Sequence, residues 1–548
     1  MNYNFGFGNF TFRLPDHTKV KEAATINDFI NGIATIPEES ILYHANSHHF
    51  SNWLAARAEF NLASIIRSIS ANDFDNGESI RNYILNHLKK DKKDQRGNVV
   101  NYSSSRFNSN NSDFFRLCSG SLGGKARGLG FARSMIHYSN IKDQFDNFAI
   151  RVPKSAVIGT DEFDRFMKDN LLWEIALSDI SDIKLQKSFL NARLSIDLTL
   201  KLESFIKENK YPIAVRSSSL LEDSQYQPLA GTYETIMLPN NSRSNKRRLN
   251  ELIEAIKIVY ASTFKGEART LLKNTAHRIE EEKMAVLIQE VVGVTYKSKR
   301  FYPTFSGVLQ SINYYPVSYM QRNEGVAYLA LGFGRTIADG EKCLRISPKY
   351  PKILPQFFSI KSTLQNSQNK FYGMTLKQKD LNEKYQLNTY SLQDAESDGV
   401  LKWVGSAISS DDGKIIDSLA HPGTRVVSFS PILKWDNIPF AKLASEILSI
   451  GKKALGCPVE IEFAVNIKEN SLPEFCLLQI KPMVLTGLHR SNKDTIINES
   501  LTFCKSSVAL GDGKIDTIKD LIIIRSESFD ISKSKEIVDE LSTINKKF

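Results

Sequence analysis

An arginine followed by three serines is the part of this sequence best suited to bind a polyanion. Arg216 follows the apolar residues 213–215 and precedes Ser217, Ser218 and Ser219. The apolar run predicts a buried strand, which would hold the guanidinium in a fixed position. Guanidinium and hydroxyl groups are donors that bind phosphate oxygens. The segment therefore predicts contact with the phosphates of a nucleotide; the alternative is a surface turn with a structural arginine.

A glycine-rich segment, residues 120–130, offers a second place where phosphate could bind. It contains Gly123, Gly124 and Lys125 and leads into residues of helical character. Backbone amides at a helix start attract phosphate, as does a lysine ammonium. The segment is not a Walker loop, because Ala126 stands where the magnesium-binding hydroxyl would be. Taken alone, it is equally consistent with a flexible helix entry and a solvated lysine.

Two glutamates separated by one residue could bind a divalent cation. Glu460 and Glu462 lie in residues 458–465, where apolar residues alternate with them, so both carboxylates would project from one face of a strand. Magnesium prefers hard oxygen ligands and needs only one or two protein carboxylates beside phosphate and water. Gln479 on the next predicted strand could add an oxygen, and Lys481 beyond it could face phosphate. The alternative is an exposed strand face with ordinary glutamates.

The elements that would position these residues form a mixed α/β arrangement. Residues 22–90 show apolar spacings of three and four, which predict helices, and the Ser- and Asn-rich residues 101–113 predict a linker. Helices are also predicted at residues 161–169, with Thr160 as N-cap, and at residues 532–541. The predicted strands are residues 148–152, 155–158, 213–216, 284–291, 325–331, 401–407, 459–465, 475–480 and 520–524.

Composition bounds the class of protein. The chain has 548 residues, 41% hydrophobic and 24% charged, which is typical of soluble globular proteins with several domains. Its net charge is +10, but acidic residues interrupt the basic stretches, so we expect no nucleic-acid partner. Apolar runs fall far short of the roughly 20 residues of a membrane span, and no signal region opens the chain. We therefore expect no membrane partner and a cytoplasmic location. The five cysteines form no CxxC pair, so neither a zinc site nor a disulfide framework is indicated.

Taken in order, five segments resemble the N-terminal ATP-binding domain of phosphoenolpyruvate synthase and pyruvate phosphate dikinase. The resemblance spans roughly residues 114–483. It rests on Gly123-Gly124-Lys125, Val215-Arg216-Ser217-Ser218, Ala230-Gly231-Thr232-Tyr233-Glu234-Thr235, Glu460-Ile461-Glu462 and Gln479-Ile480-Lys481-Pro482.

The resemblance implies a two-lobed ATP-grasp nucleotide-binding domain of the α/β (α+β) class, with an extra helical N-terminal region. We expect residues 1–113 to form that region and a polar linker. Residues 114–240 would form the first lobe and residues 241–487 the second lobe, with its metal-binding strands. Residues 488–548 would form a short tail that resembles the start of a swivelling domain.

The resemblance also implies ATP and Mg²⁺ as cofactors and suggests roles for individual residues. The catalytic residues would be Lys125, Arg216 and Lys481. Glu462 and Gln479 would bind magnesium. Residues 231–232 would close over the phosphates as a lid. The nucleotide-binding residues would be Gly123, Gly124, Lys125, Arg216, Ser217, Gly231, Thr232, Glu460 and Gln479.

Three departures from the family pattern concern the chemistry. Glu460 replaces an aspartate, which lengthens its reach, and Lys481 replaces an arginine whose planar fork would grip phosphate. The family's phosphohistidine segment is not found. Only 65 residues follow Met483, whereas a TIM-barrel pyruvate domain alone takes about 250. We therefore expect both of these domains to be absent.

The sequence thus predicts an enzyme, an ATP- and magnesium-dependent phosphotransferase of the dikinase type that lacks its own phosphohistidine and pyruvate domains. Its partners would be ATP and a histidine-bearing phosphoacceptor domain in trans. One alternative is a non-catalytic ATP-binding regulatory module acting on a partner protein. Another is an enzyme that phosphorylates a small molecule.

Overall fold

The computed structural model divides the chain into two units, residues Met1–Val484 and Leu485–Phe548. It describes residues 9–23, 26–55, 60–68, 74, 76–94, 100–101, 114–219, 233–273, 282–296, 298–317, 320–377, 387–409, 413–483, 500, 502–503, 518–524 and 533–545. In the second unit these include the helix α20 (Ser534–Asn545), close to the helix expected at residues 532–541. Residues 520–524, expected to form a strand, have no regular secondary structure; a short apolar run does not by itself determine the element that forms.

The N-terminal part of the first unit is helical, as the spacing of its apolar residues predicts, but it opens with a β-hairpin that was not expected. The rings of Phe12, Phe29, Phe50 and Trp53 are buried together in a core of its own. The hairpin consists of β1 (Phe10–Arg13) and β2 (Lys19–Ala23). The helices are α1 (Ile26–Ile33), α2 (Glu38–Asn46), α3 (His49–Ala55), α4 (Phe60–Arg67) and α5 (Gly77–Asp94).

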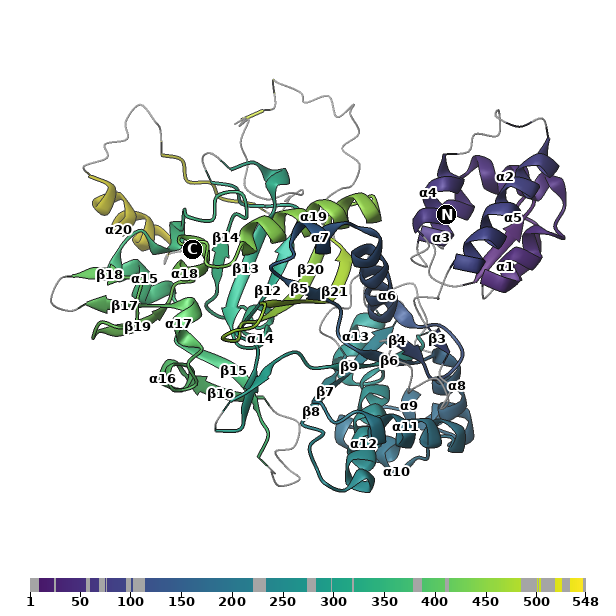
Figure 1. Cartoon of the computed structure of the whole chain (residues 1–548), viewed down its shortest axis with the longest axis horizontal. Coiled ribbons are helices and arrows are strands. Elements are labelled where there is room, and N and C mark those ends of the chain that lie inside the picture. Colours follow the sequence, from purple (N-terminus) through teal and green to yellow (C-terminus); the bar gives the residue numbers. More distant parts are fainter. Residues whose placement is uncertain are drawn as a thin grey trace. The chain divides into compact units, whose positions relative to one another are not determined.

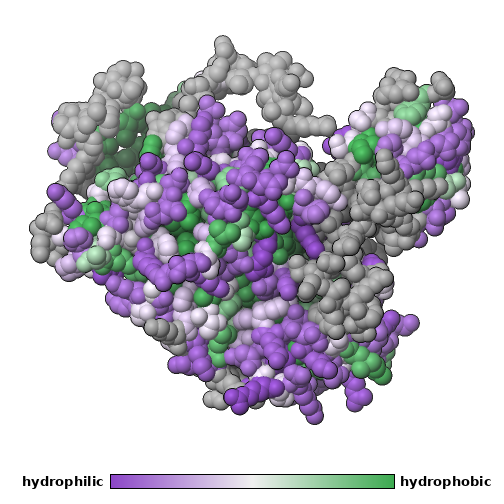
Figure 2. All heavy atoms as spheres, viewed as in Figure 1, coloured by the Kyte–Doolittle hydropathy of each residue, from purple (hydrophilic) through white to green (hydrophobic). Residues whose placement is uncertain are grey.

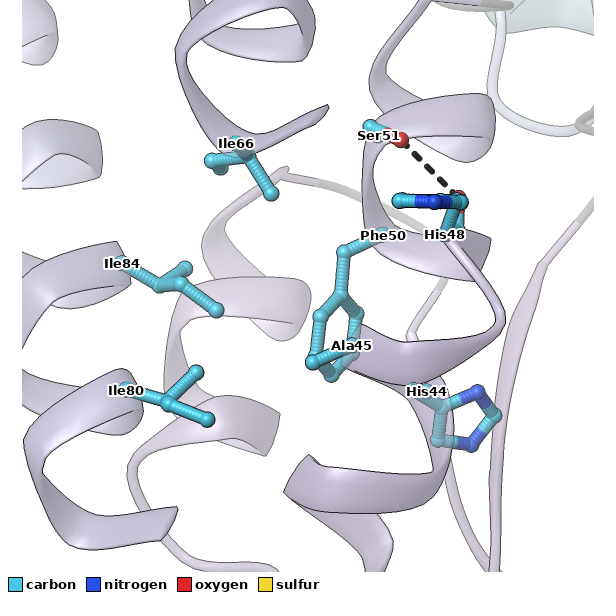
Figure 3. A pocket seen from close by; sticks show the side chains of 8 residues that line it. All are labelled: His44, Ala45, His48, Phe50, Ser51, Ile66, Ile80 and Ile84. Carbon is cyan, nitrogen blue, oxygen red and sulfur yellow. Dashed lines mark hydrogen bonds between the residues drawn. The ribbon is translucent and has the colours of Figure 1, made fainter. Parts of the chain in front are cut away.

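A buried histidine of this region, His44, lines a small pocket (Figure 3). The backbone N–H of Arg13 donates to Nε2 of His44 over 2.7 Å, so the proton of the neutral His44 ring sits on Nδ1, which lies 3.0 Å from Nδ1 of His49. Burial, with the nearby His49 and Arg13, lowers the pKa of His44 to about 3. Protonation of His44 would remove the acceptor that Arg13 uses.

We expect this region to lose stability as the pH falls below about 6.5, the usual pKa of an exposed histidine. Because the pKa of His44 is lower in the folded chain, the unfolded chain binds more protons between that value and about 3. Stability then rises with pH across this window, by up to about 1.4 kcal/mol per pH unit. Hydrogen exchange of residues 38–55, corrected for intrinsic rates, measures the slope. His44→Gln should remove most of this dependence of stability on pH, whereas His137→Gln, at an exposed histidine, should keep it. If the dependence were unchanged in His44→Gln, His44 would not be its cause.

The next part of the first unit is built on a six-stranded sheet, called here the first sheet. Its strands follow the order β3 (Val100–Asn101), β4 (Phe114–Arg116), β6 (Ser155–Ile158), β9 (Met284–Glu290), β7 (Ile213–Ser219) and β8 (Thr235–Leu238). Helices cover one face of it and share a core with Val215, Val286 and Ile288. They are α8 (Thr160–Asp169), α9 (Trp173–Leu177), α10 (Asp182–Asn191), α11 (Ile196–Glu208), α12 (Asn245–Ser262) and α13 (Gly266–Lys273).

A second six-stranded sheet, called here the second sheet, carries the strands with the paired glutamates. Its order is β14 (Leu344–Ile346), β13 (Val326–Leu331), β12 (Phe305–Gln310), β20 (Val459–Asn466), β21 (Glu474–Pro482) and β5 (Ala149–Arg151). The helix α19 (Phe440–Leu455) contacts β20, and α6 (Gly123–Tyr138) contacts β21 of this sheet and β7 of the first (Figure 1). The helix α6 therefore bridges the two sheets.

Two smaller sheets complete the described part of the first unit. One has the order β10 (Val294–Thr295), β11 (Arg300–Tyr302), β15 (Lys370–Thr375) and β16 (Asn388–Ser391), and the other β18 (Lys414–Ile416), β17 (Gly405–Ser409) and β19 (Thr424–Val427). The remaining helices are α7 (Ile141–Gln144), α14 (Arg335–Ala338), α15 (Ile360–Asn366), α16 (Leu392–Ser397), α17 (Leu401–Val404) and α18 (Ser430–Leu433), with 3₁₀ turns at Arg322–Glu324 and Pro355–Phe357.

Most predicted strands are present, and two details besides residues 520–524 are wrong. The strand expected at residues 401–407 is a helical turn, α17, followed by β17, because a short apolar run does not distinguish a buried helix from a strand. Thr160 is the first residue of α8 and Gly159 is its N-cap. The fold is mixed α/β, as expected. The domain limits expected at residues 113, 240 and 487 stay predictions, although β9, beyond residue 240, pairs within the first sheet.

Across the described residues, the longest helices are too short or too polar to cross a bilayer. Hydrophilic side chains cover much of the face seen in Figure 2.

Candidate functional site

Arg216 joins the two sheets through its guanidinium group. It lies on β7 of the first sheet, where Nη1 donates to Oε1 of Gln289 on β9 over 3.0 Å. Its Nη2 donates to the second sheet, over 2.9 Å to Oε1 of Gln479 and 3.4 Å to Oε2 of Glu462. The Arg216 side chain is only 15% exposed. The predicted phosphate-binding arginine and the two predicted magnesium ligands are thus in direct contact.

The strand pair β20–β21 places four predicted site residues on one face. Glu462 lies opposite Gln479, and Glu460 lies opposite Lys481. The alternation that predicted this face holds, because Val459, Ile461 and Phe463, which alternate with the glutamates, are buried in the core. The strand β20 thus has a polar face, which carries the glutamates, and an apolar face, which packs in the core.

Glu460 has its own set of partners, distinct from those of Glu462. Its carboxylate lies 3.0 Å from Nζ of Lys481 and accepts a hydrogen bond of 2.8 Å from Nε2 of Gln310 on β12. A lysine ammonium and an amide therefore face Glu460, whereas the Arg216 guanidinium faces Glu462. The two glutamates, although only one residue apart, occupy different electrostatic environments.

The glycine-rich segment packs against the end of β7. Ser218 binds the start of α6 twice, since its Oγ donates to the carbonyl of Leu122 over 2.8 Å and accepts from the backbone N–H of Ala126 over 3.1 Å. The side chain of Lys125 reaches Oγ of Ser217 at 3.2 Å. The N-terminus of this 16-residue helix, which favours anions, is thereby held next to Arg216.

Gly123 permits this close packing, and we expect Gly123→Ala to disrupt it. Its φ is +73°, and a Cβ there would lie 1.5 Å from the carbonyl oxygen of Ser218. The substitution must therefore push α6 away from β7, which should lower the melting temperature and abolish ATP-induced stabilisation. Gly399→Ala is the matched control, because Gly399 has φ +74° with no atom within 4 Å of its Cβ position. Equal effects of the two substitutions in thermal-shift measurements would show that backbone strain, rather than the contact, matters at Gly123.

The structure therefore gathers the predicted residues that it describes into one site. Gly123, Gly124 and Lys125 come from α6, Arg216 and Ser217 from β7, and Glu460, Glu462, Gln479 and Lys481 from β20 and β21. Gly231 and Thr232 lie outside the described residues.

Two glutamines belong to the site but were not predicted as members of it. Gln289 is only 3% exposed, unlike most glutamines. Its Nε2 also donates to the carbonyl of Leu478 over 3.2 Å. Leu478 lies where the register of β20 and β21 shifts. The signal in the sequence was a polar residue at the end of the apolar run 284–288. Gln310, the partner of Glu460, ends β12 in the same way.

The residues present fit a magnesium ion with bound phosphates. Oε2 of Glu462 and Oε1 of Gln479 both accept from one atom, Nη2 of Arg216, so two hard oxygens already converge on one cationic position. Within the described ranges, no cluster of three or more His, Cys, Asp or Glu side chains suits a metal ion. A cation at this site would therefore depend on ligands beyond those side chains, as Mg²⁺ does when phosphate oxygens and waters complete its shell.

Two sheets joined by one arginine, with a glycine-rich helix start and paired oxygen ligands beside it, define a nucleotide-binding protein. The sequence model of the pyruvate phosphate dikinase AMP/ATP-binding domain matches residues 119–500, and the chain belongs to this family. It carries the ATP-binding domain that phosphoenolpyruvate synthase and pyruvate phosphate dikinase share.

A curated relative is the Uncharacterized phosphotransferase YvkC of Bacillus subtilis (strain 168). It is 28% identical to this chain over 192 residues, which are 34% of this chain and 20% of the relative. The match thus spans about a fifth of the length of the relative.

Proposed function

We propose that this chain transfers phosphoryl groups from ATP in a magnesium-dependent reaction of the dikinase type. The observation that carries the proposal is the position of Arg216, which contacts Gln289 in the first sheet and both Glu462 and Gln479 in the second. Phosphoryl transfer needs little covalent chemistry from the protein and depends on positioning and charge neutralisation. A fixed guanidinium between two sheets, beside oxygen ligands for a cation, supplies both.

The residues of the site divide this work among them. Lys125 and Arg216 would bind the triphosphate, and the amides of Gly123 and Gly124 would face its oxygens. Glu462 and Gln479 would hold Mg²⁺, which neutralises the phosphate charge that develops during transfer.

Glu460 and Lys481 form a second pair of charged residues that would also contact the nucleotide. Glu460 would bind the ribose, or lie near the metal, and Lys481, held by Glu460 at 3.0 Å, would face the phosphates.

The acceptor in this proposal is a histidine on a separate domain or chain. In transfer of the β,γ-pyrophosphoryl group, the acceptor nitrogen bonds to the β-phosphorus, the bond between that phosphorus and the α,β-bridging oxygen breaks, and AMP leaves with that oxygen. Transfer of the γ-phosphoryl group alone releases ADP. The nucleotide product therefore reports the type of reaction.

The test is chromatography of the nucleotides after the purified chain is incubated with MgATP, with and without pyruvate, and with EDTA as the metal-free control. Because the histidine-bearing acceptor is not in this assay, water takes the pyrophosphoryl group. We expect AMP and pyrophosphate to form and EDTA to suppress both. ADP as the product would exclude the dikinase reaction. Unchanged ATP, together with ATP-dependent thermal stabilisation, would favour a regulatory ATP-binding module that acts on a partner protein.

A further inference from the structure

Arg151 lies at the point where the chain passes from the second sheet to the first. It ends β5, which pairs in parallel with β21, so that Arg151 lies opposite Cys476. Ser155, four residues further, begins β6 of the first sheet. The short crossover, residues 152–154, thus connects the two halves of the site directly.

The side chain of Arg151 is bound by one carboxylate from each sheet. Nη1 and Nη2 donate to the two oxygens of Glu290, over 2.8 and 3.1 Å, at the end of β9 in the first sheet. Its Nε donates to Glu474 at the start of β21 in the second sheet. A bidentate guanidinium–carboxylate contact fixes direction as well as distance.

Both carboxylates are held by other groups as well. Glu290 accepts a hydrogen bond of 3.1 Å from the backbone N–H of Lys154 in the crossover, and Glu474 accepts one of 2.7 Å from Nδ2 of Asn466. The Arg151 side chain is one-third exposed and the two glutamates are less so. The ion triad of Arg151, Glu290 and Glu474 is therefore partly screened from water. Ion pairs in such a place are stronger than those on an open surface.

The triad lies next to the candidate site along β9. Gln289, which binds Arg216 and the carbonyl of Leu478, directly precedes Glu290. Two consecutive residues of β9 thus reach β21, Gln289 inside the site and Glu290 through Arg151. Together they hold β9 and β21 in a fixed relation at two points.

We propose that Arg151 is a positioning residue, a clamp that holds the first sheet against the second so that Arg216 meets Glu462 and Gln479. The clamp rests on the proposed function, because it matters only if both sheets bind one nucleotide. Its loss would leave each half of the site folded but no longer aligned. A nucleotide bound to the first sheet would then no longer contact the second sheet as well.

Hydrogen–deuterium exchange of the full chain with Mg²⁺ and α,β-methylene-ATP, an analogue that cannot be cleaved to AMP, tests the clamp. In the wild type we expect the analogue to protect β7 as well as β20 and β21. In Arg151→Met we expect β7 to keep its protection while that of β20 and β21 falls about fivefold or more, the low end of coupling between sites. Protection of both segments as in the wild type would overturn the clamp.

Two further variants separate alignment from stability. Arg300 is likewise held by two carboxylates, Asp394 and Asp398, but in the small sheet of β11 and β15; Arg300→Met should destabilise the chain and leave both segments protected. The triple variant R151M/E290Q/E474Q removes the carboxylates that Arg151→Met leaves unpaired. It should regain thermal stability but not the joint protection. If joint protection returns with stability, Arg151 has only a structural role.

The same experiment distinguishes failure of the clamp from failure of the proposed function. Protection of both sheets in a wild type that forms no AMP would refute the dikinase reaction and leave the comparison with Arg151→Met valid. A wild type without any protection by the analogue would overturn both proposals.

Discussion

Arg216→Lys is expected to lower the rate of AMP formation from MgATP by about 10³-fold, the lower range for a guanidinium that stabilises phosphoryl transfer. Arg216 uses two nitrogens in different directions, Nη1 toward Gln289 and Nη2 toward Gln479. A lysine ammonium is a single point charge and lacks this fork. It would bind one sheet or the other, so the loss should appear mainly in kcat.

Arg269→Lys is a matched control for this prediction. Arg269 also uses its fork for two acceptors, the carbonyls of Ser178 and Ala176, both at 2.9 Å, in the helices of the first sheet. Its replacement should lower the melting temperature slightly and leave the rate of AMP formation unchanged. If both variants lost activity to the same extent, loss of stability rather than of phosphate binding would explain Arg216→Lys.

Glu462→Gln is expected to reduce AMP formation by about 10²- to 10³-fold, as for the removal of a preorganised electrostatic group. The substitution conserves shape and an oxygen that Arg216 can still bind, so folding should be unaffected. It removes the only carboxylate among the two oxygen ligands that converge on Nη2 of Arg216. The magnesium concentration that gives half-maximal rate should rise, which a titration with Mg²⁺ measures.

Glu460→Gln provides the comparison, since Glu460 projects from the same face of β20. Its partners are Lys481 and Gln310 rather than Arg216. We expect a higher KM for ATP with little change in the magnesium requirement. If instead Glu460→Gln shifted the magnesium titration and Glu462→Gln did not, the roles of the two glutamates would be exchanged.

Local patterns predicted the individual parts of the site well. Alternation of apolar and acidic residues placed Glu460 and Glu462 on one face of β20. The apolar run 213–215 predicted the strand that carries Arg216, although β7 continues to Ser219 instead of ending at Arg216. Both features depend on side chains only a few residues apart, so the sequence contains the necessary information.

Contacts between distant strands could not be predicted in the same way. Gln289 lies 73 residues from Arg216, and Gln479 lies 263 residues from it. Their meeting depends on strand order, on the register shift beside Glu462 and on the relation of the two sheets. None of these leaves a local pattern, and the strand wrongly expected at residues 401–407 shows that even local patterns fail for short apolar runs.

The membership of β5 in the second sheet has a consequence for the order in which the chain folds during synthesis. Arg151 is made 323 residues before Glu474, its partner on β21. At about 5 to 20 residues per second, β5 must wait on the order of 15 to 60 seconds for that strand. The first sheet needs only the chain up to β9 and can form while the ribosome is still translating the second. We therefore expect the nascent chain to expose β5 as an unpaired strand beside a folded first sheet, at the stage when chaperones would be most needed.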